Sequence, residues 1–242
     1  AIEMELNEGR TRCAFHPADL SSLRATAALA AQLEAALPQL DVLANVAGVM
    51  LSERRETAEG LELTMAVGHF SAFVLTHGLL PALGRAPHAR VVNVAGVPRD
   101  VLRPSLDLDD LNHERHHKGV RVAIDAVHAK TVMAEVLAAR LRGQQIDVNA
   151  FHPGWVRGGL GRDLPWHLKQ VFKLIGPFMS DGSVSGMHAT GAASIEGTTG
   201  QLFVKTQPRP LAFEAAYKDA LWLRTVATVE GVLGNGWVAN AA

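Results

Sequence analysis

One long stretch, Arg121 to Arg142, places small or apolar residues at helical spacing, which predicts an amphipathic helix. Its four-residue repeat is carried by Met133, Leu137 and Leu141. Gly143 follows as a residue that can end the helix. Lys130 is the only fixed cation between Arg121 and Arg140 in this sequence. Unless its stem carries the charge to solvent, Lys130 faces the core and becomes a candidate for chemistry.

Shorter apolar runs alternate with further helical patterns along the rest of the chain. The predicted strands are Arg12–Leu20 (with its turn), Asp41–Val46, Ala89–Val94, Gln145–Phe151 and Gln201–Val204. The other predicted helices are Leu23–Leu37 (capped by Ser21 or Ser22), Thr57–Leu80, Val184–Ser194 and Leu211–Val229. Such alternation indicates an α/β fold with a mostly parallel sheet and helices on both faces.

Two details of this pattern point to a site. Gly68 falls inside a predicted helix, where glycine costs about 1 kcal/mol relative to alanine, so a neighbouring element is expected to approach closely. His152-Pro153-Gly154 breaks the Gln145–Phe151 strand where an α/β sheet opens its ligand crevice. The segments Pro98–Gly119 and Trp155–Asp181 are predicted to be a surface loop and a long excursion near that crevice.

Composition narrows the class of protein. The chain has 242 residues, a net charge of -1 and one cysteine, Cys13. A single domain over residues 1–242 is expected, without a nucleic-acid footprint or a disulfide framework. No run of about 18 apolar residues is present, so no membrane span is expected. These features predict a soluble cytoplasmic protein.

Four segments in fixed order carry a family resemblance: DVLANVAGVM, RVVNVAG, the helix with Lys130, and NAFHPGWVR. Glu62–Leu80, DLDDLNHERHHKG and GTTGQLFV add to it. Together they resemble the short-chain dehydrogenase/reductase family, especially its retinol-dehydrogenase-like branch, over about Arg12 to Leu233. The resemblance implies an NAD(P)-dependent oxidoreductase on a Rossmann-type sheet.

The sequence departs from this family at its front. A dinucleotide pyrophosphate requires a glycine-rich turn between a strand and a helix, and the eleven residues before Arg12 are too few for that unit. We therefore expect a Rossmann-like, doubly wound parallel sheet that lacks its first strand-helix-strand unit. The Arg12–Leu20 and Asp41–Val46 strands then pair directly, or an edge is left exposed for a second chain to cover. A homo-oligomer is expected, or an assembly with an intact relative.

The sequence also departs from the family at the catalytic positions. The family's acid/base Tyr corresponds to Ala126, its Ser to Ala95 or Gly96, and its helix Asn to Met65. The hydroxyl residue that the family uses to hold the nicotinamide amide corresponds to Gly158 or Gly159. Of the implied catalytic group only Lys130 is retained. His128 lies two positions from Ala126, about 200° around a helix axis, so it is expected to face elsewhere.

From these departures we predict a repurposed non-redox enzyme, of the cyclase, isomerase or lyase type, that acts on a mostly apolar small molecule without a cofactor or metal. The candidate catalytic residues are Lys130, Arg157 and His152. The predicted pocket residues are Met65, Ala95, Gly96, Ala126, Trp155 and Trp166. Two alternatives stay open, namely a non-catalytic pseudo-subunit or scaffold, and an NAD(P)-dependent oxidoreductase whose front half is missing from the sequence.

Simpler structural roles compete for several of these residues. Lys130 could pair with a carboxylate or a backbone oxygen, and Arg157 could be a solvated surface residue. His113, His116 and His117 with Glu114 have a loose metal-like spacing, but the resembling family is polar there without metal, so no metal site is expected.

Overall fold

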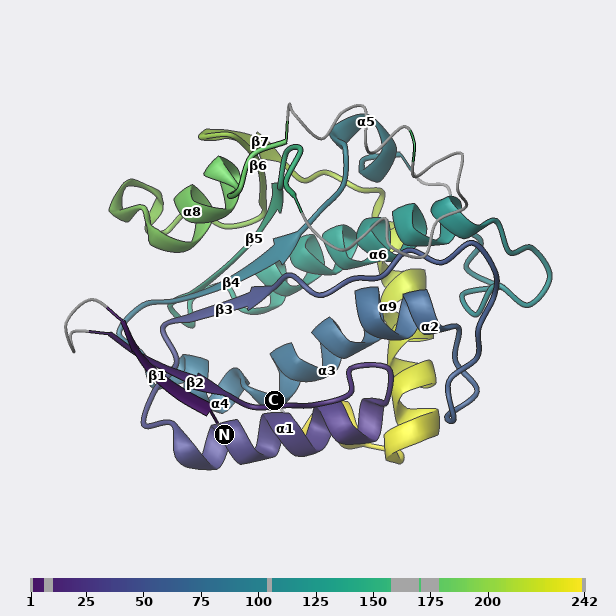
Figure 1. The fold of residues 1–242 in the computed structure, drawn as a ribbon, viewed down its shortest axis with the longest axis horizontal. Coiled ribbons are helices and arrows are strands. Elements are labelled where there is room, and N and C mark those ends of the chain that lie inside the picture. The colour runs from purple at the N-terminus through teal and green to yellow at the C-terminus, as the bar shows by residue number, and fades with distance from the viewer. Residues whose placement is uncertain (1, 7–10, 104–105, 158–169, 171–178, 241–242) are drawn as a thin grey trace.

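The computed structural model describes residues 2–6, 11–103, 106–157, 170 and 179–240 (Figure 1). Its centre is a five-stranded sheet in the order β3-β4-β5-β6-β7. Strands β3 to β6 are parallel, and β7 is antiparallel to β6. The strands are β3 (Val42–Asn45), β4 (Ala89–Val94), β5 (Ile146–His152), β6 (Gln201–Val204) and β7 (Gln207–Pro210). The predicted Rossmann-like α/β sheet is confirmed.

Helices cover both faces of this sheet (Figure 1). The longest helix, α6 (Gly119–Arg140), packs against β4 and β5, and α8 (Val184–Gly191) packs against β4, β5 and β6. On the same side of the sheet as α6 lie α1 (Leu23–Ala36), α2 (Leu63–Met65), the π-helical turn η1 (Ala66–Phe70), α3 (Ser71–Gly78), α4 (Leu80–Gly84) and α9 (Ala215–Leu233). The remaining short helices are α5 (Pro98–Val101), η3 (Ala193–Ile195) and α10 (Trp237–Asn240).

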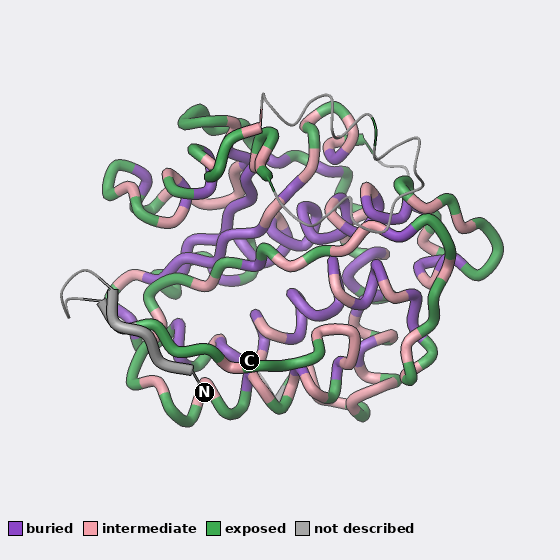
Figure 2. The backbone as a smooth tube through the Cα atoms, in the orientation of Figure 1, coloured by how far each residue is buried: buried purple, intermediate pink, exposed green. Residues whose placement is uncertain are grey.

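The core follows the two central strands and the longest helix. Every residue of β4 except Val94, and every residue of β5 except His152, is buried. Strands covered on both faces are mainly apolar, and ARVVNV is apolar except at Arg90 and Asn93, which are buried as well. Figure 2 shows the same concentration of buried residues along β4, β5 and α6. These three elements form the rigid support of the site.

The helix predicted over Thr57–Leu80 begins later and is interrupted. Gly60 adopts a positive φ of 77° in a turn, and the Glu62 carboxylate accepts a hydrogen bond from the Met65 amide at 2.8 Å, which caps α2. The chain then passes through η1 before it continues as α3. Periodicity alone cannot show this break, because apolar residues continue through it.

The first strands differ from the prediction as well. β1 (Ile2–Leu6) and β2 (Thr11–Phe15) form a separate antiparallel pair, so the Arg12–Leu20 segment does not pair with β3. The sequence left two arrangements open: direct pairing of this segment with β3, or an exposed edge at β3. The structure has the exposed edge, because β3 pairs only with β4 among the described residues. None of the helices in the described ranges is both long and apolar enough to cross a membrane.

Candidate functional site

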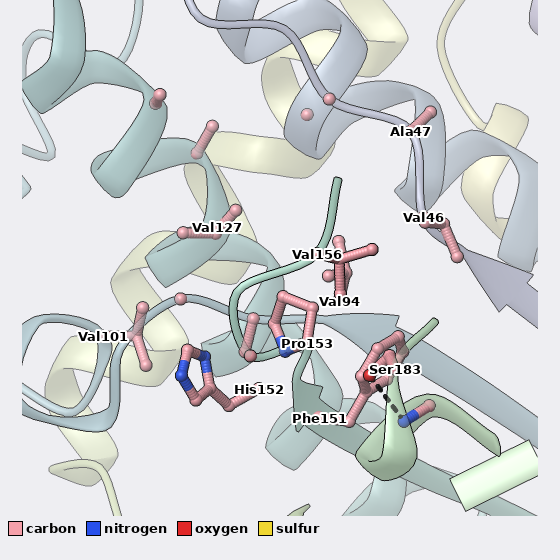
Figure 3. Close-up of a pocket in the computed structure, with 18 of the residues that line it drawn as sticks. Val46, Ala47, Val94, Val101, Val127, Phe151, His152, Pro153, Val156 and Ser183 are labelled. Carbon is pink, nitrogen blue, oxygen red and sulfur yellow. Dashed lines mark hydrogen bonds between the residues drawn. The ribbon is translucent and has the colours of Figure 1, made fainter. Parts of the chain in front are cut away.

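A cavity of about 810 Å³ opens at the carboxyl ends of β3, β4 and β5 (Figure 3). Its walls are the segments that follow these strands, together with one face of α6 and the start of α8. The residues that form most of it are Val46–Met50, Val94–Val97, Phe151–Gly154, Ala123, Ala126, Val127, Gly186 and Met187. Ligands of open α/β sheets bind in this position, and the volume lies within the usual range for small-molecule sites.

His152 is the titratable side chain placed most directly in this cavity. It ends β5 and is half-buried, and in Figure 3 its ring lies between Val101 and Pro153. Burial lowers the pKa of His152 below its usual value of 6.5. Its Nδ1 atom is buried and has no hydrogen-bond partner in the described part of the chain. The buried Nδ1 is not accessible from the cavity, so a ligand there could contact the ring only at its other edge, which carries Nε2.

Arg157 also lines the cavity, but its guanidinium forms an ion pair at the protein surface. Its Nη1 donates a hydrogen bond to Asp181 at 3.1 Å, and its side chain is 56% exposed. An ion pair this exposed contributes little to stability. The simpler surface role accounts for this geometry, and the structure places Arg157 at the rim.

Lys130 lies beneath the cavity wall. It is 2% exposed, and its Nζ donates to the carbonyl oxygens of Asn45 at 3.4 Å and Ala47 at 3.5 Å. Burial lowers its pKa from 10.5 to about 7. It contacts a water-sized space of about 10 Å³ that His69, Thr76 and Asn93 also line. Lys130 thus supports the backbone after β3 from behind, since Ala47 lines the main cavity.

A close approach between η1 and α6 shapes the inner wall, as the interior glycine predicted. A Cβ added to Gly68 would lie 2.9 Å from the Cβ of Ala126. A Cβ on Gly96 would lie 2.9 Å from Val101 Cγ1. Small residues at these positions let the elements meet and leave the space between them open.

This approach can be tested by a double-mutant cycle. Gly68→Ala is expected to lower the free energy of unfolding by about 1 to 3 kcal/mol, because the added methyl overpacks against Ala126. Ala126→Gly alone should cost about 1 kcal/mol of helix propensity. In the double variant the two losses should be less than additive, measured by chemical denaturation. Gly84→Ala, where an added Cβ meets nothing within 4 Å, is the control, and strict additivity would contradict the close approach.

The predicted pocket residues divide into three groups. Ala95, Gly96 and Ala126 line the cavity. Met65 does not, since it is fully buried in the core. Trp155 is 59% exposed and is not among the lining residues, while Trp166, like Gly158 and Gly159, lies outside the described residues.

Thr64 lines the cavity, whereas the sequence predicted that its neighbour Met65 would do so. The available signal was the four-residue spacing between Thr64 and Gly68, which places both on one helix face. Alignment to the resembling family drew attention to position 65 instead. A shift of one residue moves a side chain by about 100° around a helix, which is enough to take it out of a pocket.

Two histidine groups outside the cavity have structural partners. His128 faces away from the cavity, as helical geometry predicted: its Nδ1 lies 2.7 Å from the Val101 oxygen and its Nε2 lies 2.7 Å from the Tyr217 hydroxyl. In the loop before α6, His117 Nε2 lies 3.6 Å from Glu62 Oε1. Within the described ranges, no group of three or more His, Cys, Asp or Glu side chains is arranged to hold a metal ion.

Comparisons with known proteins bear on the identity of this site. The family model for short chain dehydrogenase matches residues 1–104. The chain is 30% identical to bovine (Bos taurus) retinol dehydrogenase 12, over 92% of this chain and 71% of that protein. It is 30% identical to human (Homo sapiens) retinol dehydrogenase 14, over 84% of this chain and 63% of that protein. A solved structure of an uncharacterized protein from Mycobacterium paratuberculosis superposes with a TM-score of 0.62 at 22% identity, covering 89% of this chain and 75% of that one.

These findings contradict the predicted non-redox enzyme, and with it the cyclase and pseudoenzyme hypotheses and the absence of a cofactor. The matched family model and the curated relatives are dehydrogenases. The prediction took the substitutions at positions 65, 95, 96 and 126 as a loss of redox chemistry. Met65 does not reach the cavity, and positions 95, 96 and 126 still shape a crevice that contains a titratable histidine. The chain belongs to the short-chain dehydrogenase/reductase family, on its retinol-dehydrogenase-like branch.

Proposed function

We propose that this protein is an NAD(P)-dependent oxidoreductase that interconverts a small, mostly apolar alcohol and the corresponding aldehyde or ketone. The observation that carries the proposal is the apolar cavity at the carboxyl ends of β3, β4 and β5, with the half-buried His152 ring in its wall. The 30% identity to retinol dehydrogenase 12 makes a retinoid-like alcohol a suitable first substrate. The proposed compartment is the cytoplasm, because the single cysteine fits a reducing environment.

The walls of the cavity fit the nicotinamide end of such a cofactor. A Cβ added to Gly48 would meet no heavy atom within 4 Å, so a side chain there would occupy cavity space. Beneath this segment, Lys130 binds the carbonyl oxygens of Asn45 and Ala47. The segments Val46–Gly48 and Val94–Gly96 would hold the nicotinamide and its ribose between them. When bound, the dinucleotide accepts or supplies the hydride.

The proton that accompanies hydride transfer needs an acceptor in the protein. His152 can take the hydroxyl proton of the alcohol on Nε2, which is not among the buried ring nitrogens, during oxidation and return it during reduction. Ala95 and Ala126 line the same cavity and carry no ionisable group. Their small side chains leave room for the substrate beside the imidazole. In this proposal, proton transfer takes place at the end of β5.

Titration of the purified protein with NADH and NADPH, followed by nucleotide fluorescence, tests the proposal. Saturable binding of one nucleotide and its oxidation on addition of retinaldehyde are expected. Gly48→Val should weaken nucleotide binding by about tenfold or more without lowering the melting temperature, because its side chain enters open space. Gly191→Ala, outside the cavity and equally open, is the control. Failure of both nucleotides to bind would refute the proposed function.

A further inference from the structure

One wall of the cavity is a short arm that follows β4. The arm consists of residues 96–101 and ends with α5, and Gly96, Val97, Asp100 and Val101 line the cavity. Its backbone makes one hydrogen bond to the rest of the part of the chain that the structure describes. This bond joins the carbonyl oxygen of Val101 to Nδ1 of His128 in α6, at 2.7 Å. The polar attachment of this wall therefore depends on one side chain.

The direction of this hydrogen bond follows from its partners. A carbonyl oxygen only accepts, so Nδ1 of His128 carries the hydrogen, and Nε2 of the neutral ring accepts from the Tyr217 hydroxyl at 2.7 Å. Burial lowers the pKa of His128 below its usual 6.5, and burial together with the nearby Asp125 raises the pKa of Tyr217 to about 12. Both groups are neutral at pH 7, so Tyr217 keeps His128 in the form that donates to Val101.

Packing connects this bond to the shape of the cavity. Val101 Cγ1 lies 2.9 Å from the point that a Cβ on Gly96 would occupy, and Val127 Cγ2 lies 3.2 Å from the same point. The end of the arm is thus packed against its own start and against α6. His128 is fully buried, and its ring meets Phe213 edge-on with the ring centroids 5.6 Å apart. Neither His128 nor Tyr217 is among the residues that line the cavity.

Loss of the imidazole would leave the buried Val101 carbonyl without a partner. Buried carbonyl groups are nearly always hydrogen-bonded, because an unpaired one carries its full cost of desolvation. This carbonyl regains a partner when it moves toward water, and the arm moves with it. The wall should then be less well defined, although no residue of the lining has changed.

We propose that His128 and Tyr217 are positioning residues, which hold the arm against α6 and so fix how the cavity orients an apolar substrate. They act through the Val101 carbonyl and touch neither substrate nor cofactor. A displacement of about 1 Å at a reacting centre can lower a rate by about 100-fold, so a loose wall should slow turnover. The effect on turnover rests on the proposed function, whereas the effect on the wall does not.

Amide hydrogen exchange over residues 96–103 tests the attachment of the arm without a cofactor. His128→Leu should exchange about tenfold faster than wild-type protein there and bind retinol about tenfold more weakly, followed by retinol fluorescence. His128→Asn should restore most of both, because its amide nitrogen can take the place of Nδ1 as donor. The matched control is His77→Leu, since His77 is buried outside the cavity and its Nδ1 lies 2.9 Å from the Phe73 carbonyl oxygen.

Turnover supplies a second measurement. In His128→Leu, kcat for retinol should fall by about tenfold while the nucleotide Kd stays within about twofold of wild type. Tyr217→Phe should change exchange and kcat in the same direction by about threefold, because His128 loses the donor that fixes its tautomer. Thermal melts show whether His128→Leu is folded, and Tyr217→Phe decides the matter if it is not.

The possible outcomes separate this proposal from the proposed function. Exchange and retinol binding in His128→Leu that match those of His77→Leu would overturn the positioning role, even in an active enzyme. So would His128→Asn that exchanges as fast as His128→Leu. A change confined to the His128 and Tyr217 variants, in a protein that binds neither NADH nor NADPH, would support the positioning role and refute the redox function.

Discussion

Replacing His152 with alanine is expected to lower kcat/KM for oxidation of an apolar alcohol by about 100-fold to 10,000-fold, the usual contribution of a general base. The reason is that the half-buried His152 ring lines the cavity in which the alcohol would bind. His152→Gln keeps much of the shape and polarity but cannot accept the proton, so it should be similarly impaired. Nucleotide binding should be nearly unchanged in both variants, which separates proton transfer from cofactor binding.

The pH dependence provides an independent check on His152. Oxidation requires the neutral ring, and burial lowers the pKa of His152 below 6.5, so the neutral form already dominates at pH 7. Wild-type kcat/KM for oxidation should therefore be constant near neutrality and fall as the pH decreases through that lowered pKa. His152→Ala should lack this acidic limb, whereas His16→Ala, outside the cavity, should keep it. An unchanged acidic limb in His152→Ala would assign the proton acceptor elsewhere.

Lys130→Met is expected to increase the free energy of unfolding at pH 7 by a few kcal/mol. Burial lowers the pKa of Lys130 from 10.5 to about 7, so holding its ammonium form inside the protein is costly. Its Nζ is bound only by the long contacts to Asn45 and Ala47 among the hydrogen bonds of the described residues. An apolar side chain of similar length removes the cost and retains the packing.

The same shift fixes how stability depends on pH. Between about pH 7 and pH 10.5 the unfolded chain holds the Lys130 proton more strongly than the folded chain does. The free energy of unfolding should therefore rise with pH in this window. Denaturation from about pH 7 to pH 9 should show this rise in wild-type and Lys205→Met protein but not in Lys130→Met. A rise of equal size in Lys130→Met would show that other groups cause it.

The elements of the core were predictable because their patterns have no competing interpretation. ARVVNV is a buried parallel strand, and its observed bounds coincide with the predicted ones. The helix around Lys130 was predicted over 121–142 and spans 119–140. β7 was missed because QPRP contains two prolines and no apolar alternation, and it forms only by pairing with β6. The break before α2 depends on a side-chain cap and a turn, which periodicity does not show.

The candidate site was only partly predictable. The positions after the strands follow from the topology of α/β sheets, so His152, Ala95 and Gly96 could be placed at the crevice. The depth of Lys130 and the involvement of Thr64 depend on how α6 and η1 rotate against each other, which a sequence does not specify. The prediction of a non-redox enzyme was wrong because it rested on the side chains that the family has at positions 95, 96 and 126 and this chain lacks. The residues around these positions still form the crevice.

The two edges of the sheet differ in a way that limits how copies of this chain can associate. On the β7 side, Pro208 and Pro210 have no amide hydrogen, so only the residues that alternate with them can donate hydrogen bonds to β6. The two prolines then occupy the outward-facing positions, and this edge offers no amide donor there to another strand. On the β3 side, the outer backbone groups have no strand partner among the described residues. We propose a homo-oligomer in which β3 of each copy meets the other about a two-fold axis. In this proposed dimer, such pairing uses the open β3 edge of both copies, so strand pairing ends at two sheets.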